Sequence, residues 1–186
     1  MSQTAHWWYP AERPADLKAV IVSVDGLLAD PRADEHLLSD AVWDLHCGGI
    51  RVAVVTSGHW PAVHRQVREL FGDGAVEVLV TGDEVNRPKP DPEAYQHALW
   101  QLGVRAADAI AVEDSAPGLR AALSAGLTTV VVTAERSASA EFTGAAAVLS
   151  RHEASEQLSV HGCRRLLLGS QRLNVDSRFP LVAACG

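Results

Sequence analysis

Short apolar runs rich in Val and Ile recur along the chain and alternate with longer stretches of helical character. This alternation is typical of a parallel sheet covered by helices on both faces. Glycines stand where several of the helices should stop. The expected strands are Ala19–Val24, Arg51–Thr56, Val76–Val80, Ala109–Glu113, Thr128–Val132 and, more weakly patterned, Ala145–Leu149. The expected helices are Asp34–Cys47, Pro61–Phe71, Pro92–Leu102 and Ala116–Ala125. We predict an α/β fold with three layers and a Rossmann-like parallel sheet.

The chain length predicts one main domain. With 186 residues, 47% of them hydrophobic, the chain can bury one sizeable core and is near the commonest size of a single domain. We expect residues 1–16 to form an aromatic, Pro-rich arm, residues 17–168 the α/β core domain, and residues 169–186 a tail after a last helix.

Composition excludes several classes of partner. The net charge of −7 and the absence of a Lys/Arg run argue against a nucleic-acid surface, which needs clustered basic residues. No apolar run reaches membrane-spanning length, and the N-terminus lacks the pattern of a signal peptide. The cysteines Cys47, Cys163 and Cys185 lack metal-ligand spacing, and we expect reduced, buried thiols. These features predict a cytoplasmic protein without nucleic-acid or membrane partners.

Polar residues follow four of the expected strands, where open parallel sheets bind their ligands. They are the segments Ser23-Val24-Asp25-Gly26, Thr56-Ser57-Gly58, Arg87-Pro88-Lys89-Pro90 and Glu113-Asp114-Ser115. A hydroxyl and an ammonium suit phosphate oxygens, whereas carboxylates suit a hard cation such as Mg²⁺. This combination predicts a phosphoryl-transfer site.

These segments, in this order, resemble the four motifs of the haloacid dehalogenase-like superfamily, in its phosphoglycolate phosphatase and beta-phosphoglucomutase branch. "VSVDGLLAD" resembles the first motif, "VAVVTSG" the second, "RPKPDPEAYQHALWQLGV" the third and "AIAVEDSAPGLRAALSAGL" the fourth. The last two are the most specific. The resemblance spans residues 17–149 and implies phosphatase chemistry on small phosphorylated molecules.

The resemblance also implies a role for each site residue. Asp25 matches the acid that protonates the leaving oxygen and then activates water, and its backbone carbonyl would bind Mg²⁺. Thr56, Ser57 and Lys89 would bind the phosphoryl group, with Thr56 and Lys89 also contributing to catalysis. The remaining metal ligands would be Glu113 and Asp114.

Ser23 stands at the nucleophile position, where the family has an aspartate that forms an aspartyl phosphate. A serine needs a base to remove its proton, and the sequence shows no obvious one. Loss of this carboxylate also weakens the expected Mg²⁺ site. We therefore expect a degenerate phosphatase with a binding or regulatory role; the alternative is an active Mg²⁺-dependent phosphomonoester hydrolase with Ser23 at the nucleophile position.

The spacing of the motifs departs from the family too. Family members of this branch insert a helical cap between the first and second motifs, but only residues 31–49 are available here. We therefore expect the cap domain to be absent and the site to be open.

Several roles have structural alternatives that the sequence leaves open. Ser23 is either a phosphate-binding hydroxyl or a small strand residue, and Lys89 either a site residue or a surface lysine. Glu113 and Asp114 are either metal ligands or caps of the following helix.

The N-terminal arm carries Trp7, Trp8 and Tyr9 in succession. Adjacent large aromatic residues are common anchors of interfaces. We expect them either to complete the core of their own domain or to support a homo-oligomer or a protein partner.

Overall fold

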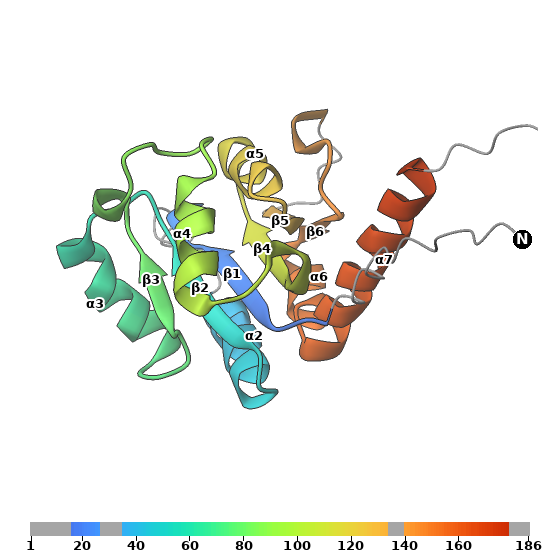
Figure 1. Cartoon of the computed structure of the whole chain (residues 1–186). Coiled ribbons are helices and arrows are strands. Elements are labelled where there is room, and N and C mark those ends of the chain that lie inside the picture. Colours follow the sequence, from blue (N-terminus) through green and yellow to red (C-terminus); the bar gives the residue numbers. More distant parts are fainter. Residues whose placement is uncertain (1–15, 27–34, 134–139, 179–186) are drawn as a thin grey trace, which may run out of the picture.

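The computed structural model describes residues 16–26, 35–133 and 140–178. The strands of these residues form one parallel sheet in the order β3-β2-β1-β4-β5-β6, the order of a doubly wound Rossmann-like fold. Helices cover both faces (Figure 1), so the predicted three-layer α/β fold is confirmed. The strands are β1 (Ala19–Ser23), β2 (Arg51–Val55), β3 (Val78–Val80), β4 (Ala109–Glu113), β5 (Thr128–Thr133) and β6 (Ala147–Ser150). The helices are α2 (Glu35–Cys47), α3 (Trp60–Phe71), α4 (Glu93–Leu102), α5 (Ala116–Ser124), α6 (Arg151–Gln157) and α7 (Val160–Arg178), with short 3₁₀ turns η1 (Gly82–Glu84), η2 (Ala106–Asp108) and η3 (Ala140–Phe142).

The central strands are apolar up to their last residue because helices cover both of their sides. All five residues of β1 are buried. Val20 and Val22 join a core with residues of α2, α3, α6 and α7. Ala19 and Ile21 join a second core with residues of α4 and α5. Burial on both faces explains why the strands read as continuous apolar runs rather than as alternating patterns.

The two cores differ in the size of their side chains. The core under α2 and α3 holds large residues such as Leu45 and Phe71. The core under α4 and α5 is rich in alanine, contributed by both the sheet and the helices. Small side chains allow a helix backbone to lie close to a sheet, and Tyr95 of α4 is the largest fully buried side chain in this second core.

Several predicted boundaries differ from the structure. Strand β3 begins at Val78 rather than Val76, although the Glu77 amide already donates a 2.8 Å hydrogen bond to the Val52 carbonyl. The last helix of the core is two helices, because the Ser150 side chain caps α6 separately. Helix α7 continues across the boundary predicted between residues 168 and 169.

The thiols differ from one another. Cys163 is buried as expected, and burial raises its pKa to about 12. Cys47, the final residue of α2, is exposed, so its predicted burial was wrong. The described residues do not include Cys185, nor Trp7, Trp8 and Tyr9 with the interface predicted for the arm.

Within the described part of the chain, no helix is both long and apolar enough to cross a membrane.

Helix α7 offers a matched test of the core. Leu167 is 1% exposed in the core and its neighbour Leu168 is 49% exposed. Leu167→Ala should lower the free energy of unfolding by about 2–5 kcal/mol, because it leaves a cavity. Leu168→Ala should lower it by less than about 1 kcal/mol. Urea denaturation of both variants measures the difference; equal effects would show that α7 does not pack as described.

Candidate active site

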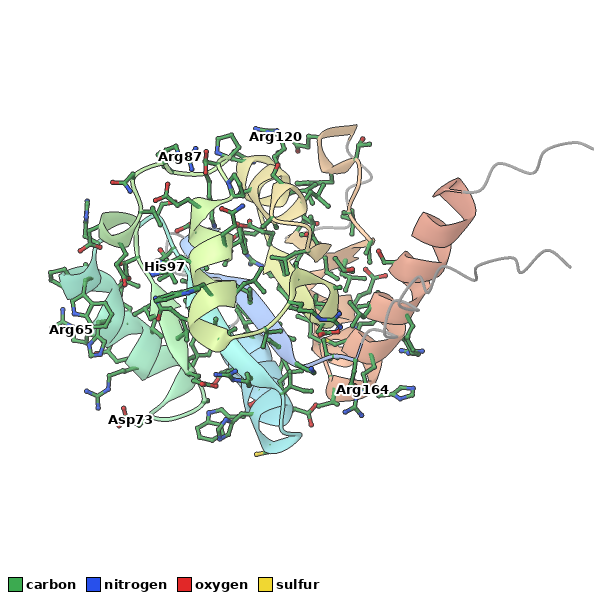
Figure 2. The ribbon with its side chains drawn as sticks, viewed as in Figure 1. Arg65, Asp73, Arg87, His97, Arg120 and Arg164 are labelled. Atoms are coloured by element: carbon green, nitrogen blue, oxygen red, sulfur yellow. The ribbon has the colours of Figure 1, made fainter. Side chains whose placement is uncertain are left out.

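The sheet register brings the ends of the central strands together. Ser23, the last residue of β1, pairs with Val55 of β2, and Val22 pairs with Val112 of β4. The residues that follow β2 and β4 therefore flank the end of β1. A loop between η1 and α4 adds Lys89 to this edge. In Figure 2, Arg87 of that loop lies along the upper rim of the molecule, and Asp73, which follows α3, lies at the opposite end.

The Lys89 ammonium is the centre of the site. Its Nζ donates hydrogen bonds to Ser23 Oγ at 2.8 Å, Asp25 Oδ2 at 3.0 Å and Glu113 Oε1 at 2.8 Å. Only 7% of its side chain is exposed. Burial alone would lower the pKa of Lys89, but the Glu113 and Asp25 carboxylates outweigh it and raise the pKa. The ammonium is therefore charged and uses all three of its hydrogens.

Glu93, the first residue of α4, fixes the loop that carries Lys89. The Glu93 carboxylate accepts hydrogen bonds from the backbone amides of Asn86 and Arg87, at 2.9 and 3.1 Å. The Arg87 side chain makes ion pairs with Glu93 and Asp91, at 3.2 and 3.3 Å. These contacts close the loop onto the first turn of α4 and hold Lys89 between them.

Asp25 lies opposite Lys89. Its carboxylate accepts hydrogen bonds from Thr56 Oγ1 at 2.8 Å, the Ser57 amide at 2.7 Å and Ser57 Oγ at 3.2 Å. Burial would raise the pKa of Asp25, but Lys89 and these hydrogen bonds together lower it. The carboxylate is therefore ionised, and 28% of the side chain remains exposed.

Glu113 is fully buried and organises the other side of Lys89. Its Oε1 accepts from Lys89 and from the hydroxyl of Tyr95. Its Oε2 accepts from the amides of Asp114 and Ser115 and from Ser115 Oγ, at 3.1, 3.4 and 3.2 Å. Because both oxygens are engaged by the protein, Glu113 in this arrangement orients Lys89, and its role as a metal ligand stays a prediction.

Sequence reasoning missed Tyr95. It lies on α4 and is 0% exposed. A buried phenol needs a hydrogen-bond partner, and this requirement was the signal that could have linked Tyr95 to the site. The buried carboxylate of Glu113 is that partner, and together with burial it raises the pKa of Tyr95 well above its usual value.

Asp114 faces the turn after β1. Its Oδ2 accepts a 2.8 Å hydrogen bond from the Gly26 amide, and burial together with the neighbouring Glu113 raises its pKa. Ser115 caps α5 by accepting from the Gly118 amide at 3.1 Å. Capping of α5, predicted as one alternative for the acidic pair, is thus performed by Ser115.

The site offers Mg²⁺ few carboxylate oxygens. Mg²⁺ favours oxygen ligands in near-octahedral geometry, but both carboxylate oxygens of Glu113 accept hydrogen bonds from the protein. Asp114 is the carboxylate with fewest hydrogen bonds, and the Asp25 backbone carbonyl is the other predicted donor. Within the described ranges, no group of three or more His, Cys, Asp or Glu side chains is arranged to hold an ion.

A doubly wound parallel sheet with an acid, hydroxyls and a lysine gathered at its carboxyl edge defines a Rossmann-like α/β protein with a polar site at that edge. A family model described as haloacid dehalogenase-like hydrolase matches residues 36–132. The chain therefore belongs to the haloacid dehalogenase-like hydrolase family, as its motifs predicted.

Curated relatives and solved structures agree with this assignment. Protein CbbY of Cereibacter sphaeroides is 40% identical over 111 residues, which are 58% of this chain and 48% of that protein. Hexitol phosphatase A of Escherichia coli is 39% identical over 90 residues, 48% of this chain and 41% of that protein. The chain thus spans about half the length of these relatives or less.

Two solved structures share the fold. CbbY from Rhodobacter sphaeroides in complex with phosphate aligns with a TM-score of 0.64 and 24% identity, over 80% of this chain and 99% of that chain. A family hydrolase from Deinococcus radiodurans with bound phosphate and sodium aligns with a TM-score of 0.57 and 25% identity, over 67% and 60%.

The packing of Glu113 predicts the effect of adding one methyl group at Gly118. A Cβ there would lie 2.0 Å from the Glu113 carboxyl atoms, so Gly118→Ala should destabilise the protein by about 1–3 kcal/mol through overpacking. At Gly169 of α7 nothing lies within 4 Å. Gly169→Ala should be neutral or stabilising by up to about 1 kcal/mol. Thermal unfolding compares the two; a neutral Gly118→Ala would contradict the position assigned to Glu113.

Proposed function

We propose that this protein keeps the phosphoryl-binding part of a haloacid dehalogenase-like phosphatase but hydrolyses phosphomonoesters weakly or not at all, and that it acts by binding or regulation. The observation that carries the proposal is the hydroxyl of Ser23 at the end of β1, hydrogen-bonded to Lys89 at 2.8 Å. An aspartate at this position attacks phosphorus in the family that the sequence resembles.

Ser23 is poorly placed to replace that aspartate. A serine nucleophile needs a neighbouring base, but the partner of Ser23 is the ammonium of Lys89, whose raised pKa keeps it protonated. The nearest ionised carboxylate of the site, Asp25, is held by Lys89, Thr56 and Ser57. Loss of the nucleophile costs on the order of 10⁶ in turnover in another hydrolase, so a route through Asp25 and water would be slow.

The phosphoryl-binding groups are retained. Thr56 Oγ1, the Ser57 amide and Lys89 Nζ point at one place, the position now taken by Asp25. Such charge-assisted donors suit phosphate oxygens. A small phosphorylated molecule is therefore the proposed ligand.

The metal site of the family would be weakened in this chain. Asp114 and the Asp25 carbonyl would hold Mg²⁺, with Glu113 supporting them, and the ion would supply charge neutralisation for the phosphoryl oxygens. Ser23 contributes no anionic ligand, and both oxygens of Glu113 are engaged by the protein, so the proposed affinity for Mg²⁺ is low.

A missing cap is also part of the proposal. In the described residues between the first and second motifs, α2 places Val42 and Leu45 in the core against the sheet. It packs as a layer of the domain, which supports an open site without a separate cap. An open site excludes water poorly, and this reduces the electrostatic advantage of a phosphatase site.

An active hydrolase is the second candidate. The names of two relatives, hexitol phosphatase A and validoxylamine A 7'-phosphate phosphatase, describe phosphatases. The site residues Asp25, Thr56 and Lys89 are all brought together. Under this candidate Ser23 would be bypassed or would attack phosphorus itself.

Turnover of a generic phosphomonoester separates the two candidates. The wild type should release phosphate at or near the background rate, whereas Ser23→Asp should gain a Mg²⁺-dependent rate because it restores an attacking carboxylate. Asp25→Asn added to Ser23→Asp should abolish that rate. Phosphate release is followed with and without Mg²⁺; rapid turnover by the wild type that survives Ser23→Ala would overturn the proposal.

Metal affinity gives an independent check. Ser23→Asp should bind Mg²⁺ at least about tenfold more tightly than the wild type, since it adds an anionic oxygen ligand. Ser23→Asn is the matched control because it adds similar volume without charge. Isothermal titration with Mg²⁺ measures both, and an equal gain for the two variants would argue against a metal site beside residue 23.

A further inference from the structure

Four hydrogen-bond donors converge on the carboxylate of Asp25. They are Thr56 Oγ1, the Ser57 amide, Ser57 Oγ and Lys89 Nζ, at 2.8, 2.7, 3.2 and 3.0 Å from its oxygens. We call these four donors the oxyanion cradle. Thr56 Oγ1 and the Ser57 amide donate to Oδ1, whereas Ser57 Oγ and Lys89 Nζ donate to Oδ2. Each carboxylate oxygen therefore accepts two hydrogen bonds.

Every hydrogen of the cradle is already in use. The hydroxyls of Thr56 and Ser57 each have one hydrogen, and both are directed at Asp25. Lys89 divides its three among Asp25, Ser23 and Glu113. The Gly58 amide donates to Thr56 Oγ1 at 3.0 Å and fixes the direction of that hydroxyl. An arriving oxyanion therefore gains these four donors only if Asp25 moves away.

The charge of the site also favours the internal carboxylate. Lys89 is the one cation in contact with Asp25 and Glu113 in the described structure, and Asp114 adds a third carboxyl group beside Gly26. Because residue 23 is a neutral serine, the positive charge of Lys89 attracts only the carboxylates of Asp25 and Glu113 among its three hydrogen-bond partners. An external anion must compete with a carboxylate that is already in place.

We propose that the Asp25 carboxylate is an internal competitor for the oxyanion cradle, so that phosphate or a phosphomonoester binds only by displacing it. This inference rests on the proposed function, which assigns these donors to a phosphoryl group. Asp25 has room to leave, because 28% of its side chain is exposed and Ser57 is exposed beside it. In this arrangement Asp25 sets the affinity for the anion, in addition to any role in proton transfer.

Titration of the full chain with inorganic phosphate, in the presence of a metal chelator, tests the inference. Asp25→Ala should bind phosphate at least about tenfold more tightly than the wild type, because the cradle is empty before the ligand arrives. Asp114→Asn is the matched control: it reduces negative charge in the same site but removes no acceptor from the cradle. It should give a clearly smaller gain.

A second variant shows whether the gain comes from the cradle. Thr56→Val in the Asp25→Ala background removes one donor and should lose most of the gain, with folding checked by circular dichroism. Asp25→Ser repeats the test with a small polar residue if Asp25→Ala does not fold. Affinity in Asp25→Ala no higher than in the wild type, a gain equal to that of Asp114→Asn, or no phosphate binding by any variant would each overturn the inference.

Binding and turnover distinguish this inference from the proposed function. Rapid hydrolysis by the wild type would overturn the proposed function, yet a selective gain in phosphate affinity for Asp25→Ala would still support the competition. Negligible hydrolysis by the wild type, with no gain in phosphate affinity for Asp25→Ala, would support the proposed function. The same result would overturn the inference that Asp25 competes with the anion.

Discussion

The buried ammonium of Lys89 is the constraint on which the site depends. A charged group that is only 7% exposed must be paired, and here Ser23, Asp25 and Glu113 supply its three acceptors. The pairing joins β1, β4 and the loop before α4 into one unit. The direction of Glu113 then depends on Tyr95 and on Asp114 and Ser115, which immediately precede α5. The positions of the Asp25 and Glu113 carboxylates thus follow from the need to neutralise one cation.

Residues of the same chemical type differ in burial and in hydrogen-bond partners within this network. Asp25, Glu113 and Asp114 are all carboxylic acids at the ends of strands. Asp25 is partly exposed and accepts from groups that suit a phosphoryl anion; Glu113 is fully buried and accepts from five donors of the protein; Asp114 accepts from the Gly26 amide. Burial and partners, rather than residue type, separate the partly exposed Asp25 from the buried Glu113 that orients the lysine.

The fold and much of the site could be predicted from sequence because their signals are local. The strands are continuous apolar runs, and the site segments follow them directly, so Ser23, Thr56 and Glu113 had to meet at one edge of a parallel sheet. The inward turn of Glu113 and the contribution of Tyr95 were not predictable in the same way, since they depend on how α4 and α5 pack across the sheet. The extent of α7 was missed because its sequence has no clear helical period beyond residue 168.

The alanine-rich layer beneath α4 and α5 makes the site sensitive to distant packing. Ala98 lies wholly within this layer, on the same helix that carries Tyr95 and anchors the Lys89 loop through Glu93. A larger side chain at such a position would lift the helix from the sheet and move the lysine with it. The position of Lys89 is therefore governed in part by a helix–sheet contact outside the site.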